Sequence, residues 1–337
     1  MAEHYEDNGI QQRVNERGIT ESYVRGTHMT VKQLKAESED LHCVDYISKH
    51  VAAGHSDIPD QFSVPHYPRP VQFRLSKLAH VTTKEGMDGI LDRSGFTGGI
   101  NDLLWWGLAI RPGERRWAER RYLNTVFPER TLHQRRNQEP FLHAFAKSPA
   151  FKRGSRYGNF RFALPLQEVL QAYSTQFCGG KEPILRVWET VVYKQEIMYS
   201  VLVHSPDVHD YDDCPELFSN EEGVCAYHNR KIIWRAQAIS KTHQFGLIED
   251  EFDRQCSVED LEYDVFYVWD HVTLAFHIPQ GNCLYFPQER LLDCLNACPN
   301  GETGLNELIG RKKAKAIVNE RKAVAYSKVN GCFNGCN

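Results

Sequence analysis

Two strand-like segments of the chain carry side chains whose types and spacing could do chemistry. His80 and Thr82 form a His-x-Thr in the run KLAHVT, which precedes a short helix-like segment. An imidazole offers one hydrogen-bond donor and one acceptor, which suits it to a diol. Glu196 opens the β-forming run EIMYSVLVH. A fixed carboxylate there could stabilise positive charge developing in a transition state, and Glu189 competes for the same role.

Between these runs lies an aromatic-rich stretch, LHAFAKSPAFKRGSRYGNF, at residues 142–160. A flat aromatic such as Phe151 or Tyr157 could stack on a neutral heteroaromatic ring. The basic residues beside them could hold phosphates. Taken singly, most of these aromatic residues are more often part of a core than of a site.

The order of these segments resembles that of the ADP-ribosyltransferase superfamily, in the branch shared by diphtheria-type toxins and poly(ADP-ribose) polymerases. Members show a His-x-Thr or His-x-Ser strand, a helix and a Gly-Phe, and here Gly95-Phe96 follows the helix. The Phe-Ala and Ser at positions 145, 146 and 148 are similar to the family's Tyr-Phe-Ala…Ser…Tyr stretch. Tyr-Lys-Gln-Glu, ending at Glu196, resembles its Tyr-Asn-Glu-Tyr. The resemblance covers residues 77–204.

This resemblance implies an enzyme that cleaves the nicotinamide–ribose bond of NAD without a metal, as an ADP-ribosyltransferase or an NAD glycohydrolase. Its catalytic residues would be His80 on the ribose, Tyr157 at the nicotinamide and Glu196 as the carboxylate. Ala144 stands where the family has its Tyr, so Tyr157 or Phe151 would take that place. The residues contacting NAD would be His80, Thr82, Phe145, Ser148, Phe151, Arg156 and Tyr157. The acceptor stays open among protein, nucleic acid and water, and a pseudoenzyme that binds ADP-ribose is an alternative.

A different class of function is predicted by the basic residues of the segment 111–161. Residues 111–136 hold eight Arg against three Glu, and Trp117 and Tyr122 are interleaved with them. Cations that pair with phosphates and aromatic rings that stack on bases are the elements of a nucleic-acid surface. A non-enzymatic nucleic-acid or protein-binding module is therefore the alternative, although such a run is more often one solvated helix face.

The sequence patterns predict which elements position these residues. They indicate an α+β fold with a central mixed or antiparallel sheet and flanking helices. β-rich runs dominate residues 184–286, whereas helical patterns cluster early and late. We expect a flexible polar leader over 1–66, an ADP-ribosyltransferase-like core over 67–204 and a β-rich continuation or subdomain over 205–300. A basic helical tail with a flexible end would follow over 301–337. Surface helices are expected over 102–136, and a solvated loop in the acidic block 205–223.

The composition is that of an ordinary globular protein, with 337 residues, 40 Lys+Arg, 44 Asp+Glu and 41% hydrophobic residues. The net charge of −4 gives no global nucleic-acid signature. We expect no secretory signal, no membrane span and a cytoplasmic protein. The basic cluster at residues 311–315 is an alternative nuclear address. Four thiols, at Cys294, Cys298, Cys332 and Cys336, leave structural zinc open, although their spacing is not that of a tight knuckle.

Overall fold

The computed structural model describes residues 10–15, 18, 20–28, 71–126, 128–136, 157–193, 196–217, 223–236, 245–249, 256–260, 269–298 and 310–333. Its strands are β1 (Gln11–Val14), β2 (Thr20–Arg25), β3 (Val71–Leu75), β4 (Lys77–Thr82), β5 (Gly95–Thr97), β6 (Leu103–Leu108), β7 (Phe160–Pro165), β8 (Ile184–Tyr193), β9 (Glu196–His204), β10 (Cys225–His228), β11 (Lys231–Ala236), β12 (Phe245–Glu249), β13 (Cys256–Asp260), β14 (Trp269–His277), β15 (Cys283–Tyr285) and β16 (Leu295–Ala297). Its helices are α3 (Lys84–Arg93), α4 (Pro112–Val126), α5 (Leu132–Arg136), α7 (Leu166–Phe177), α8 (Gln288–Cys294) and α9 (Arg311–Phe333), with a 3-10 turn at Ile100–Asp102.

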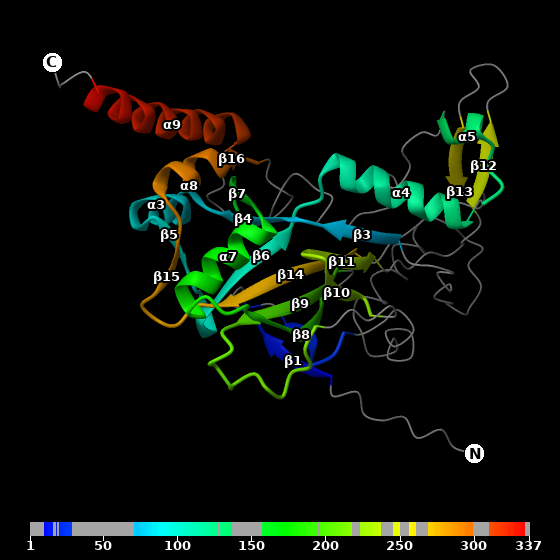
Figure 1. Ribbon diagram of the computed structural model, residues 1–337, viewed down its shortest axis with the longest axis horizontal. Coiled ribbons are helices and arrows are strands. Elements are labelled where there is room, and N and C mark those ends of the chain that lie inside the picture. Colours follow the sequence, from blue (N-terminus) through cyan, green and yellow to red (C-terminus); the bar gives the residue numbers. More distant parts are fainter. Residues whose placement is uncertain are drawn as a thin grey trace.

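Nine strands form the central sheet, in the order β1-β2-β8-β9-β14-β6-β4-β7-β16. Figure 1 shows them fanning from β1 at the lower edge to β7 and β16 at the upper edge. β9 and β14 run parallel, and every other neighbouring pair is antiparallel. Helices flank this sheet, so the expected α+β class with a large mixed sheet is confirmed.

The two faces of the sheet bury cores of unequal size, because successive strand residues point to opposite sides. In β9, Tyr199 and Val201 belong to the larger core, to which helices α3, α4, α7, α8 and α9 also contribute. Leu202 belongs to a smaller cluster on the other side, together with Leu103, Trp188, Cys214 and Ala275. The helices are therefore concentrated on one face of the sheet.

A second sheet, β10-β11-β3, supports α4, which packs along β3. Two β-rich runs joined by His228-Asn229-Arg230 predict a hairpin, and β10 and β11 form it, closed by Asn229 and Arg230 with φ of 48° and 59°. Two consecutive residues with positive φ are the signature of the type I′ turn that matches strand twist. Because α4 packs on this small sheet, the side of α4 that faces away from β3 is the side exposed to solvent.

Several local predictions are confirmed. The run TKEGMDGILDRS predicts a short helix that buries Ile90 and Leu91, and α3 buries both. It begins after Thr83, whose hydroxyl accepts a hydrogen bond from the Gly86 amide. It ends at Ser94 in the left-handed conformation, with φ of 54°. α7 likewise buries its expected apolar face, and β7, β8 and β9 form over the predicted runs.

The segment 102–136 differs from the prediction of surface helices alone, because its first part is the strand β6. Trp106 and Leu108 face the larger core and Leu103 faces the smaller one. A short strand with apolar residues on both faces shows no alternation of apolar and polar residues. Its sequence therefore cannot be told from that of a buried helix. The run GFTGG after α3 predicts a turn, but Gly95–Thr97 is likewise a strand, which pairs with β15.

Two segments assigned to outlying parts of the chain are built into the central sheet. β1 and β2 come from the expected polar leader, and they are polar because they form its edge. β14 comes from the expected β-rich continuation and lies between β9 and β6. The run QERLLDCLNACPNG predicts one helix closed by Pro299 and Gly301, but its described part divides into α8 and the strand β16.

Replacing Gly158 by Ala is expected to lower the free energy of unfolding on the order of 3 kcal/mol. Gly158 has φ of +147°, and a Cβ there would lie 2.0 Å from the Thr82 carbonyl oxygen, so β4 and β7 would have to separate. Urea unfolding followed by circular dichroism measures the change. Gly113→Ala is the control, because a Cβ at Gly113 in the first turn of α4 meets nothing within 4 Å. Equal stability of the two variants would contradict the prediction.

Candidate functional site

His80 lies in β4, and its imidazole makes a hydrogen bond to the neighbouring strand β6. Its Nδ1 donates to the Trp105 carbonyl oxygen at 2.9 Å, since a carbonyl can only accept. The ring packs edge-on against Phe96, with centroids 5.3 Å apart, and beside Trp106. Burial lowers the pKa of His80, so the ring is neutral near pH 7. One of its two nitrogens is thus already occupied by the fold.

Thr82 and Tyr157 come from neighbouring strand ends. β4 and β7 pair antiparallel, with Thr82 opposite Phe160, and the close backbone approach of Gly158 to Thr82 carries Tyr157 to the same end of the sheet. Tyr157 is 48% exposed, so its ring is open to solvent on one side. The pairing of β4 with β7 therefore gathers His80, Thr82 and Tyr157 at one end of the sheet.

Glu196 is not brought to this place. Its backbone begins β9, and β14 and β6 both lie between β9 and β4. Ala79 shares a transverse row with Ser200, so His80 and Glu196 are three strand spacings and five residues apart, about 20 Å between Cα atoms. The backbone positions of the three predicted catalytic residues therefore do not converge, because β14 and β6 separate β9 from β4. The order of the motifs along the chain gives no sign of this separation. The Glu196 side chain and residues 137–156, with Phe145, Ser148, Phe151 and Arg156, lie outside the described part.

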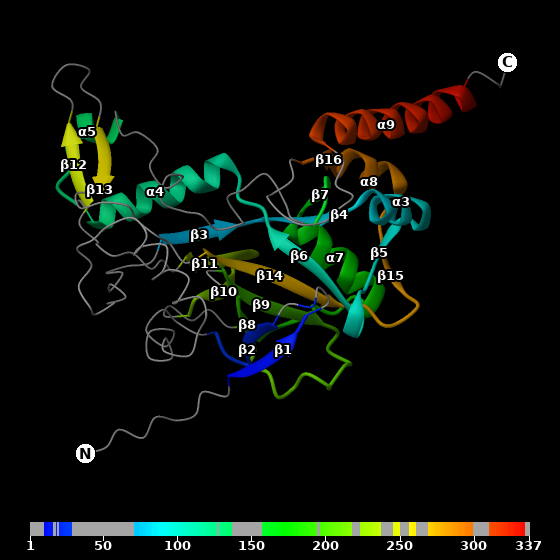
Figure 2. The same ribbon diagram turned by 180° about the vertical axis from the view of Figure 1, so that it is seen from behind.

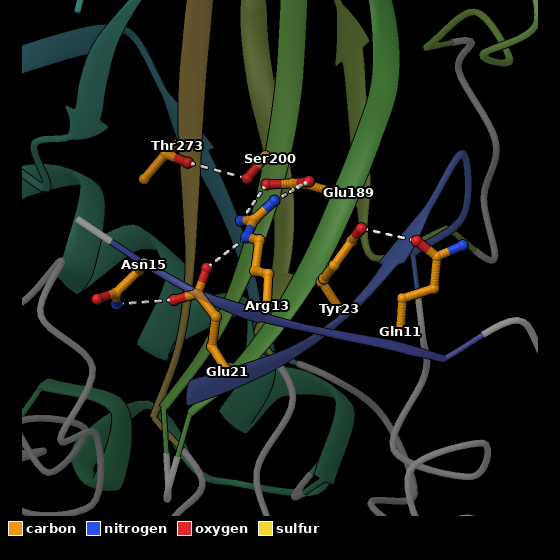
Figure 3. Close-up of polar contacts among 8 residues, drawn as sticks. All are labelled: Gln11, Arg13, Asn15, Glu21, Tyr23, Glu189, Ser200 and Thr273. Carbon is orange, nitrogen blue, oxygen red and sulfur yellow. Dashed lines mark hydrogen bonds and ion pairs between the residues drawn. The ribbon is translucent and has the colours of Figure 1, made fainter. Parts of the chain in front are cut away.

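Glu189, the competing carboxylate, is fully engaged in a structural ion pair (Figure 3). It is 1% exposed and receives two hydrogen bonds from the guanidinium of Arg13 in β1, at 2.8 and 2.9 Å. Arg13 also pairs with Glu21 at 2.7 Å. A bidentate pair of this kind holds both groups in one geometry. Glu189 therefore fastens β1 to the sheet instead of facing a ligand.

The acidic block 205–217 is held to the sheet by a buried arginine, contrary to the expectation of a purely solvated loop. Arg186 is 7% exposed and donates to His204 Nε2 at 2.9 Å and to Asp212 at 2.5 Å. Tyr211 packs edge-on against His204 and His277. This cluster is assembled by tertiary structure, because Arg186 lies in β8, His204 in β9 and His277 in β14.

The exposed side of α4 combines an aromatic ring with unpaired cations. We call Arg116, Trp117 and Arg120 the α4 basic face. Trp117 is 60% exposed, and the Arg120 guanidinium lies 5.6 Å from its ring centroid. Within the described parts of the chain, Arg116 and Arg120 make no salt bridge. The opposite side of α4 buries Tyr122 and Leu123. The packing of that side therefore holds the α4 basic face toward solvent.

Further cations border the α4 basic face. Arg121 donates to the Gln72 carbonyl oxygen of β3 at 2.6 Å. Burial, and then the nearby charge of the exposed Arg74, lower the pKa of Arg121. Two positive charges held this close repel each other, and a bound anion would relieve that repulsion. The surface thus extends from α4 onto β3.

Comparison of the chain with protein-family models, with curated proteins and with solved structures finds no match. Over the described ranges, no group of three or more His, Cys, Asp or Glu side chains is placed to hold a metal ion. Cys294 and Cys298 are buried thiols in different elements, and the side chains of Cys332 and Cys336 lie outside the description. None of the described helices is long and apolar enough to cross a membrane.

Acidification from pH 6.5 to pH 4 is expected to destabilise the fold. Burial lowers the pKa of His28 from its ordinary value of 6.5 to about 4, so the unfolded chain binds the proton first. Its contribution is present above pH 6.5 and is lost as the pH falls to 4, at about 3 kcal/mol. His80, His204 and His277 shift in the same direction. Urea unfolding at both pH values measures the effect, and an unchanged slope in His28→Gln would refute the assignment to His28.

Proposed function

We propose that this protein binds single-stranded nucleic acid through the α4 basic face. The observation that carries the proposal is Trp117, which is 60% exposed between Arg116 and Arg120, two arginines that form no salt bridge with any described residue. Its indole is a flat aromatic surface that is open to solvent and lies beside a guanidinium group. Bases of a single strand stack on such a ring whatever their sequence, while the arginines pair with the flanking phosphates.

The charge arrangement of α4 supports the same partner. Arg116 and Arg120 are one helical turn apart, and like charges at this spacing destabilise a helix by about 0.2–0.5 kcal/mol. Glu114 is already paired with Arg111 at 3.1 Å. Glu119, which precedes Arg120 in the helix, is buried, with 6% of its surface exposed. The overall charge of −4 does not oppose binding, because charges beyond a Debye length of about 10 Å are largely screened. The local charge of the α4 basic face, and not the net charge of the protein, therefore governs the binding of a nucleic acid there.

Arg116→Gln/Arg120→Gln is expected to weaken binding of a labelled oligouridine on the order of tenfold at 0.1 M salt, because two phosphate contacts are lost. The plot of log K against log salt should become shallower by about 1.4 for the same reason. Trp117→Ala should weaken binding by about tenfold without changing this slope, since stacking releases no counterion, and Trp117→Phe should keep most of the affinity. Fluorescence anisotropy over a salt series measures all three.

The matched control is Arg93→Gln/Lys181→Gln, which removes two exposed positive charges from α3 and from the loop after α7. It should bind like wild type at every salt concentration. If the control and the α4 double variant lose affinity equally, binding depends on net charge alone and the assignment to α4 is wrong.

A second candidate is a protein that binds NAD or ADP-ribose beside His80. It is favoured by the pairing of β4 with β7, which sets Thr82 close to the exposed Tyr157. An imidazole and a phenol ring there suit a ribose diol and a flat base. Because Glu196 lies three strands away, we propose binding without cleavage, in the manner of a pseudoenzyme, ahead of an active transferase or glycohydrolase.

NAD is expected to raise the melting temperature of the wild type, and less so that of His80→Gln and Tyr157→Ala, because bound ligand stabilises the folded state. Nicotinamide release from NAD should be equally slow in the wild type and in Glu196→Gln. Thermal-shift titration and chromatography of nicotinamide measure the two effects. Release that depends on Glu196 would restore the transferase hypothesis, and no thermal shift would remove this candidate.

A further inference from the structure

We infer that the first turns of α9 form a second contact for the phosphate backbone of the nucleic acid bound at α4, which rests on the proposed function above. We call Arg311, Lys312, Lys313 and Lys315 the α9 basic face. All four side chains are exposed. Within the part of the chain that the structure describes, none of them takes part in a salt bridge. Their charges are therefore available to an external anion.

These cations are held at a fixed place on the fold. Ala314, between them, is completely buried, and Val318 one turn later is 4% exposed. Both belong to the larger core, and α9 packs on β16. Arg321 pairs with Asp88 of α3 at 2.6 Å and fastens the next turn. A patch on an anchored helix loses less conformational freedom on binding than one on a loose tail.

The stability of α9 gives no reason for this placement. Four cations in the first five residues lie at the positive end of the helix dipole, and the first turn contains no acidic residue. Charges of this sign there cost about 0.3–1 kcal/mol each at low salt. A bound polyanion would offset that cost. Residues 310–325 include no aromatic side chain, so this face would contact phosphates and not bases.

The helices that carry the two basic faces, α4 and α9, both lie toward the same edge of the molecule. Figures 1 and 2 both show α4 and α9 at its upper edge, with α9 projecting from the body beyond β16. A strand bound by Trp117 at α4 can reach α9 only if it is long enough. Binding at the second face is then intramolecular, which raises the affinity for long strands and leaves short ones unaffected.

The test measures binding of oligouridines of about 8 and about 30 nucleotides, which bracket typical single-strand site sizes. Lys312→Gln/Lys313→Gln/Lys315→Gln should weaken binding of the long strand at least tenfold and make its salt dependence shallower by about 2. The short strand should bind this variant like the wild type. Arg116→Gln/Arg120→Gln should weaken binding of both strands, on the order of tenfold. Circular dichroism on each variant checks that the fold is kept.

Other outcomes separate the two hypotheses. If the α9 variant binds both strands like wild type while the α4 variant does not, this inference is wrong and the proposed function stands. If the α9 variant loses the short strand and the α4 variant loses neither, nucleic acid binds at α9 alone and both hypotheses are overturned. If the α9 variant loses binding to vesicles of anionic lipid but binds both oligouridines like the wild type, the inference is also overturned.

Discussion

The parallel ladder between β9 and β14 is the interaction on which the rest of the fold depends. It pairs Glu196–Val203 with Trp269–Phe276, and β14 pairs on its other side with β6. Without β14, the strands β1-β2-β8-β9 and β6-β4-β7-β16 would each present an open inner edge of unpaired amides and carbonyls. Leu274 and Phe276 are completely buried, so the same strand also joins the hydrophobic core across the two halves.

This ladder also decides which polar residues remain available for function. Glu189 and Arg186 lie within the sheet, and each is already paired, the first with Arg13 and the second with Asp212 and His204. His80 donates to a neighbouring strand. Burying a charge without a partner costs several kcal/mol, so the sheet retains such groups only where they are satisfied internally. Cations without a salt-bridge partner among the described residues are found instead on α4 and α9, helices that flank the sheet.

Helices α4 and α9 share one physical design. Each buries a narrow apolar stripe against the fold, Tyr122 and Leu123 in α4 and Ala314 and Val318 in α9. Each carries on its exposed side cations whose spacing or position disfavours an isolated helix. Residues that oppose local stability are the ones in which a functional explanation is to be sought. Trp117 on α4 distinguishes the two faces, because only there does the helix offer a ring for stacking.

The sequence by itself determined the elements whose signals are local. Thr83 and Ser94 bound α3, the Asn229-Arg230 turn closes the β10–β11 hairpin, and the apolar stripe of α7 was visible in its spacing. The basic composition around Trp117 was equally plain, and it predicted a solvated helix face, with a binding surface as the alternative. Only the tertiary structure decided that LLWWGL is a strand, that β14 separates Glu196 from His80 and that Glu189 meets Arg13. These are pairings between residues far apart in the chain, and their energy comes from backbone ladders and burial that no short window of sequence contains.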